Sequence, residues 1–100
     1  MTYTNMTFDI FIASLGKEKS PEGINPLLGA LWHDAKGNWQ MAHNLAQEIA
    51  TNEGSWVHGY LHRKEGDHSN AAYWYHKAKK DIPLSSIEEE WEILVKAMIN

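Results

Sequence analysis

The chain repeats one arrangement of apolar and turn residues, and this recurrence limits its fold more than any other feature. A shift of 29 residues places Gly66 on Gly37 and the polar residue Asp67 on Asn38. On both sides of each glycine, apolar residues recur every three or four positions, which is the spacing of one helical face. The pattern predicts two tandem helix-turn-helix hairpins, over residues 27–52 and 55–80; a chance match between two amphipathic hairpins is the alternative. The coinciding apolar positions are Leu27 and Trp56, Leu28 and Val57, Leu31 and Tyr60, Trp32 and Leu61, Ala42 and Ala71, Leu45 and Trp74, Ala46 and Tyr75, and Ile49 and Ala78.

One more helix is predicted on each side of the hairpins. Four apolar residues between positions 8 and 15 share a helical face, and Gly16 follows them as a stop signal. Toward the other end, Ser85 and Glu88 have the spacing of a capping box, which predicts a helix over residues 85–99. Residues 1–100 are therefore expected to form a single all-α domain with about five to six helices.

Composition narrows the classes of function. The 100 residues carry a formal net charge of -4 and contain no cysteine. Proteins that bind the nucleic-acid backbone usually need a strongly basic face, so a nucleic-acid partner is not expected. The chain has no thiol that would need an oxidising compartment, and no stretch approaches the roughly 20 apolar residues of a membrane span. We therefore expect a cytoplasmic protein with no membrane partner.

Two segments resemble a known class of helical repeats. The stretches AKGNWQMAHNLAQEI and KEGDHSNAAYWYHKAKKDIP are similar to the turn and second helix of tetratricopeptide or Sel1-type repeats. The resemblance covers residues 27–83 and implies stacked helical hairpins that bind a protein or peptide. The 29-residue period departs from the usual ~34 residues, which puts a groove-forming superhelix in doubt. The segment WVHGYLHRKEGDHSNAAYWY is also similar to a group of small bacterial proteins, a likeness that implies a compact fold and no particular activity.

Two of the six histidines are spaced for joint binding of a metal ion. His58 and His62 lie one helical turn apart and share a face with Glu65, nearly opposite the apolar stripe of their helix. Two imidazoles at this spacing can hold one metal ion, with a carboxylate oxygen as a further ligand. A histidine pair on a solvated face is, however, more often a surface or hydrogen-bonded feature. No metal or cofactor is therefore expected, and a site of these three residues is the alternative.

A second pair of polar residues, His43 and Gln47, lies one turn apart on the preceding helix. If these two helices pack side by side, the pair would meet the histidines of the next helix, with a nearby charge and aromatic rings. Such a group suits an anionic or planar small ligand, or a peptide. The alternative is that the polar groups only cross-link helices. The candidate ligand-binding residues are His43, Gln47, His58, His62, Arg63, Tyr73 and Trp74.

The residues themselves do not identify a reaction. No serine lies in a recognisable nucleophile motif, and no glycine-rich phosphate loop is present. The first hypothesis is therefore a non-enzymatic helical-repeat module that binds a protein or peptide, or associates with itself through exposed aromatic residues. Tyr73 is the aromatic residue expected to contact a partner. The second hypothesis is a small-ligand-binding protein or enzyme that uses the histidine cluster.

Overall fold

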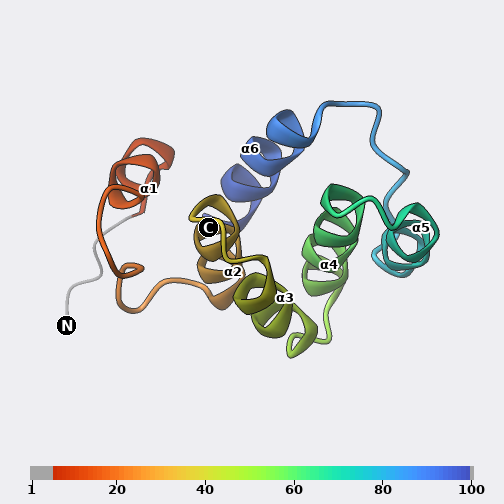
Figure 1. Cartoon of the computed structure of the whole chain (residues 1–100), viewed down its shortest axis with the longest axis horizontal. Helices are drawn as coiled ribbons and strands as arrows, with labels where there is room; N and C mark the ends of the chain where they lie inside the picture. The colour runs from red at the N-terminus through yellow and green to blue at the C-terminus, as the bar shows by residue number, and fades with distance from the viewer. Residues whose placement is uncertain (1–5, 100) are drawn as a thin grey trace.

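The computed structural model describes residues 6–99, and it confirms the all-α prediction (Figure 1). No strand occurs in that range, and no helix in it is long and apolar enough to cross a membrane. The helices are α1 (Phe8–Ser14), α2 (Pro26–Ala35), α3 (Trp39–Gln47), α4 (Asn52–Lys64), α5 (His68–Lys77) and α6 (Ile87–Met98).

The two glycine turns have the same local structure. Gly37 and Gly66 adopt φ of +86° and +88°, a left-handed conformation that a side chain would strain. The next residues, Asn38 and Asp67, cap α3 and α5 by accepting hydrogen bonds from backbone N–H groups of the first turn. The same two sequence signals thus reverse the chain at equivalent places, between α2 and α3 and between α4 and α5.

Helix α4 lies at the centre of the packing. It packs against α5 after one glycine turn and against α3 on another side, while α2 packs against α3 (Figure 1). Helix α6 returns to contact both α2 and α4, so α4 has neighbours around most of its circumference. Buried side chains from five of the helices form the core, including Phe11, Leu31, Trp32, Val57, Leu61, Leu94 and Val95.

Two helix starts differ from the sequence prediction. Helix α4 begins at Asn52, because the hydroxyl of Thr51 accepts a hydrogen bond from the N–H of Gly54 at 3.0 Å. The α3–α4 loop folds so closely over Gly54 that a Cβ there would collide with the carbonyl oxygen of Ile49. This glycine therefore sits inside a helix because of a close approach, and the expected start at Ser55 was wrong.

The capping box of α6 lies one residue later than predicted. Ser86 accepts a hydrogen bond from the N–H of Glu89, and the Glu89 carboxylate accepts one from the N–H of Ser86, both at 3.0 Å. The sequence offers two overlapping serine–glutamate pairs at the required spacing, Ser85 with Glu88 and Ser86 with Glu89. Local spacing alone could not choose between them.

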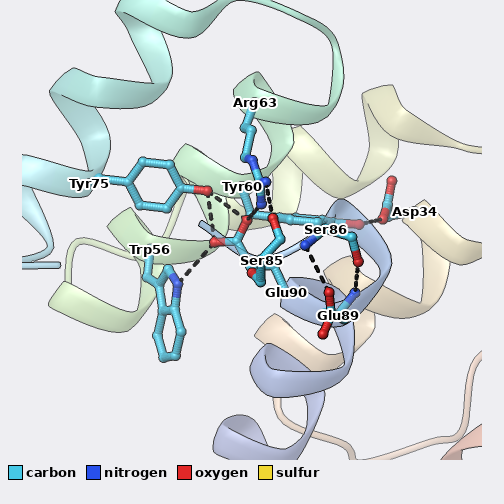
Figure 2. Close-up of polar contacts among 9 residues, drawn as sticks. All are labelled: Asp34, Trp56, Tyr60, Arg63, Tyr75, Ser85, Ser86, Glu89 and Glu90. Atoms are coloured by element: carbon cyan, nitrogen blue, oxygen red, sulfur yellow. Dashed lines mark hydrogen bonds and ion pairs between the residues drawn. The ribbon is translucent and has the colours of Figure 1, made fainter. Parts of the chain in front are cut away.

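A buried carboxylate ties α6 to the second hairpin (Figure 2). Glu90 accepts hydrogen bonds from the hydroxyl of Tyr75 at 2.7 and 2.8 Å and from the Arg63 guanidinium at 2.8 Å. The indole N–H of Trp56 donates to Oε2 of Glu90 at 3.4 Å. The guanidinium also donates to the carbonyl of Ser85. The side chains of Tyr75, Arg63 and Trp56 therefore compensate for removing the Glu90 charge from water.

A second buried carboxylate joins the first hairpin to α4. Asp34 on α2 accepts a hydrogen bond from the hydroxyl of Tyr60 at 2.7 Å and pairs with the ammonium group of Lys64 at 2.9 Å, both on α4 (Figure 2 shows the Tyr60 contact). Burial and the nearby carboxylates raise the pKa of Tyr60 above its usual range, so this hydroxyl keeps its proton and acts as a donor. The two carboxylates fix α4 against α2 and α6.

Candidate metal centre

Three histidines converge where α3 packs against α4. Nε2 of His43, on α3, lies 2.9 Å from Nε2 of His58, on α4. The ring of His62, one turn further along α4, lies 4.8 Å from the ring of His58 and 5.2 Å from the ring of His43, measured between centroids. One ring nitrogen from each of the three lies within 4.8 Å of the other two. Side-by-side packing of the two helices therefore brings these candidates together.

The cluster is more buried than the sequence pattern indicated. His58 and His62 lie nearly opposite the apolar stripe of α4, and a helix packed on one side would leave them in solvent. They are only 5% and 7% exposed, because α3 and α5 cover that side of α4. The expectation that this face is solvated was therefore wrong, whereas both rings are hydrogen-bonded, as the alternative interpretation had it. The cause of the burial is the central position of α4, which local sequence does not reveal.

Two tryptophan rings stack on histidines of the cluster. The ring of Trp74, on α5, stacks on His58 with 3.9 Å between centroids and 14° between planes. The ring of Trp39 stacks on His43 at 4.9 Å and 17°, and its indole N–H donates to the carbonyl of Leu61 at 2.8 Å. Trp39 was not among the predicted site residues. It precedes His43 by four positions, one helical turn, and this spacing could have revealed it.

The environment keeps two of the histidines neutral. Burial is the largest cause that lowers the pKa of His58, to about 4, and the charges that His43, His62 and Lys77 can carry lower it further. Burial also lowers the pKa of His43, with His62 as the next cause. At neutral pH both rings therefore have a lone pair on one nitrogen, which is the form that binds metal ions.

Glu65 takes a different place from the one predicted. Its Oε2 lies 2.7 Å from Nδ1 of His62, so the carboxylate is a hydrogen-bond partner of that ring and leaves Nε2 for other contacts. A carboxylate on the second nitrogen of a histidine is a common arrangement around metal ions, where it fixes the orientation and tautomer of the ring. The third histidine of the cluster is His43, while Glu65 lies behind His62.

The remaining predicted residues separate into two groups. Gln47 and Trp74 line a pocket of about 270 Å³ together with His58. Tyr73 is 58% exposed, and its ring lies perpendicular to that of Trp74, with 5.1 Å between ring centroids. Arg63 does not contribute its charge to this region, because its guanidinium pairs with Glu90 on α6. The next residue of a helix points about 100° away, so proximity to His62 in sequence was misleading.

Comparison with known proteins gives no relative for this chain. Neither a protein-family model, nor a curated protein, nor a solved structure matches it. The resemblance to tetratricopeptide or Sel1-type repeats, and to small bacterial proteins, therefore stays a prediction from the residues. The arrangement of the histidines is the feature from which a function can be argued.

Proposed function

We propose that the protein binds a divalent transition-metal ion, with His43, His58 and His62 as its protein ligands. The observation that carries the proposal is the convergence of three imidazole nitrogens within 4.8 Å of one another. Three histidines are a common ligand set for zinc, and they leave a further coordination position for water or another molecule. The sequence led us to expect no metal, with His58, His62 and Glu65 as the alternative ligands, and the present proposal has His43 in place of Glu65.

The spacing of the nitrogens fits a small ion after a modest adjustment. Metal–nitrogen bonds of about 2.0–2.1 Å in tetrahedral geometry separate the ligand nitrogens by roughly 3.3 Å. The His43–His58 pair, at 2.9 Å, is slightly closer than this, and His62 is within 4.8 Å of both. Side-chain movements of about 1 Å would bring all three onto one ion, a change that rotation about the χ angles supplies.

The surroundings favour the same use. Stacking on Trp39 and Trp74 fixes the planes of His43 and His58. The Glu65 carboxylate orients His62 through Nδ1. Preorganised ligands lose less conformational freedom when a metal binds, which raises affinity. Imidazole donors suit Zn²⁺, Cu²⁺ and Ni²⁺ rather than Ca²⁺ or Mg²⁺, which prefer oxygen.

The test is titration of chelator-treated, dialysed protein with Zn²⁺ by calorimetry and with Co²⁺ by visible absorption. We expect one ion per chain and a Co²⁺ spectrum typical of nitrogen ligands in low coordination number. His43→Ala and His62→Ala should each weaken binding by about 100-fold or more. Glu65→Gln should weaken it by about 10-fold, the usual loss for a partner behind a ligand.

The chain supplies its own controls, because His68 and His76 are exposed and outside the cluster. His68→Ala and His76→Ala should leave the affinity for Zn²⁺ unchanged. Absence of one-to-one binding, or equal losses in the control and cluster variants, would overturn the proposal. Circular dichroism of each variant separates loss of binding from loss of folding.

Binding of a protein or peptide, or self-association, stays a prediction from the sequence. Tyr73 is the residue among the predicted set that is best placed for it, because most of its ring is exposed. The histidine cluster has more support, since several independent contacts converge there.

A further inference from the structure

The pocket beside the histidine cluster is formed by three successive parts of the fold. The end of α3 and the α3–α4 loop provide one wall, the first turns of α4 provide the floor, and α5 provides the other wall. Its volume of about 270 Å³ is below the range typical of drug-sized ligands. The occupant that it fits is therefore a small molecule.

Two buried polar side chains on α4 face this space without a partner. Ser55 is 6% exposed, and its hydroxyl makes no hydrogen bond with any residue between 6 and 99. His58 uses Nε2 toward His43, and its Nδ1 has no partner within the same range. Among residues 6–99, Nδ1 of His43 is the one fully buried side-chain nitrogen or oxygen without a hydrogen-bond partner. The hydroxyl of Ser55 and Nδ1 of His58 are therefore not completely enclosed. Both residues line the pocket, so their free polar atoms are accessible from it.

The charge of the lining indicates what these groups would bind. Lys77 is the one residue of the lining with a permanent charge, and no carboxylate lines the pocket. Its ammonium group lies 5.1 Å from the ring centroid of Trp74. A serine hydroxyl and a lysine ammonium group are donors, which suit the oxygens of an anion. Because Ser55, His58 and Lys77 all line the pocket, a bound anion could be contacted by all three side chains.

The rest of the lining is largely apolar. Ala46, Ile49 and Ala50 face the pocket from the end of α3 and the following loop, and Trp74 faces it from α5. Such surfaces bind hydrocarbon or aromatic groups, because contact removes apolar area from water. A fully hydrated inorganic anion would leave these surfaces without a partner. The combination favours a molecule with one charged end and one apolar end.

We propose that this pocket binds a small carboxylate with an apolar body, held by Lys77, Ser55 and His58 at its charged end. The binding site adjoins the three-histidine metal centre and does not require a metal ion. It adds a ligand class to the protein that the metal proposal does not supply. The site shares His58 with the metal centre, through the opposite nitrogen of the ring.

The test uses benzoate as the probe and benzamide as its neutral counterpart of the same shape. Metal-free, dialysed ¹⁵N-labelled protein is titrated with each compound and followed by two-dimensional NMR. Benzoate should cause saturable shifts centred on the amides of Ser55 and Lys77 and on the indole N–H of Trp74. Benzamide should bind about fivefold more weakly or worse, because it lacks the charge.

Variants locate the effect without disturbing the core. Lys77→Gln and Ser55→Ala should each weaken benzoate by about fivefold, and Lys77→Gln should leave benzamide unaffected. Lys19→Gln, an exposed lysine in the α1–α2 connection, is the matched control and should change nothing. The proposal is overturned by the absence of saturable shifts with benzoate, by equal binding of the two probes, or by equal effects of the Lys77 and Lys19 changes. Failure of Zn²⁺ binding would leave it intact, so the two proposals can fail separately.

Discussion

Nε2 of His43 lies 2.9 Å from Nε2 of His58, and the two helices α3 and α4 therefore share one hydrogen bond between two imidazoles. A neutral imidazole has one N–H and one lone pair, so one ring donates and the other accepts. One added proton can occupy the free Nδ1 of the donating ring and keep this hydrogen bond, whereas a second proton, on Nε2 of the accepting ring, would place two N–H groups face to face. The contact is therefore compatible with neutral rings and is lost when both rings are protonated.

The burial of His58, together with the neighbouring His43, predicts that the metal-free protein loses stability in mild acid. The pKa of His58 is lowered from 6.5 to about 4 in the folded chain, whereas it is ordinary in the unfolded chain. Between these values the unfolded state binds more protons, so the free energy of unfolding falls as pH falls from about 6.5 toward 4. The expected contribution of this residue is a loss of about 2 kcal/mol between pH 7.5 and pH 5, measured by urea unfolding in the presence of chelator.

The control for this prediction is His58→Gln, which cannot titrate. Carboxylates also titrate in acid, so the decisive quantity is the difference between the two proteins at each pH. The variant should be less stable at pH 7.5 and should lose less stability on acidification. Equal slopes for both proteins would show that His58 is not buried as a neutral ring.

The second prediction concerns the buried charge that ties α6 to the second hairpin. Glu90→Gln keeps the size of the side chain but leaves the Arg63 guanidinium without its counter-charge. We expect a loss of about 2–4 kcal/mol in the free energy of unfolding, because an unpaired, largely buried cation is costly. Glu92→Gln on the same helix removes the exposed pair with Lys96 and should cost less than about 0.5 kcal/mol. Equal losses in urea unfolding would contradict this account.

The third prediction uses two glycines inside helices with opposite surroundings. A Cβ at Gly59 would lie 3.2–3.3 Å from the ring and backbone nitrogen of Tyr75, where α4 and α5 approach closely. At Gly29 the nearest atom would be Cδ1 of Leu45, at an ordinary 3.9 Å. Gly59→Ala should lower the free energy of unfolding by about 1–3 kcal/mol through overpacking. Gly29→Ala should raise it by about 0.5 kcal/mol through helix propensity. Thermal melts that rank the two changes in the reverse order would be inconsistent with the α4–α5 packing.

The fourth prediction links the two proposed sites through the ring of His58 and rests on both proposals. Coordination of a metal ion by Nε2 leaves the ring proton on Nδ1, where it can be donated to a carboxylate in the pocket. Benzoate should therefore bind about fivefold more tightly to the Zn²⁺-loaded protein than to the metal-free protein. Zn²⁺ should bind more tightly in the presence of benzoate by the same factor, since coupling is reciprocal. Calorimetry measures this coupling when benzoate is titrated into Zn²⁺-loaded protein and when Zn²⁺ is titrated into benzoate-saturated protein. An affinity for benzoate that is the same with and without Zn²⁺ would show that the two sites are not coupled.

The sequence by itself determined the helices and most of their ends. Apolar residues at helical spacing, the glycines at positions 37 and 66, and the capping residues Asn38 and Asp67 act on neighbouring atoms, so the sequence reveals their effects. Two helix starts were nevertheless not determined by local sequence. Two adjacent serines could each cap α6, and a glycine at position 54 gave no sign that α4 begins before it. The meeting of His43 with the histidines of α4 could be foreseen only on the condition that the two helices pack side by side.

Tertiary structure alone decided what surrounds each polar side chain. Helix α4 has neighbours on several sides, so His58 and His62 are buried although they lie away from its apolar stripe. The same packing turns Arg63 toward Glu90 and leaves Ser55 facing a pocket formed with α5. Burial, pairing and pKa depend on atoms that are distant in sequence. Helical periodicity fixes the direction of a side chain relative to its own axis, and only the assembled fold fixes what lies in that direction.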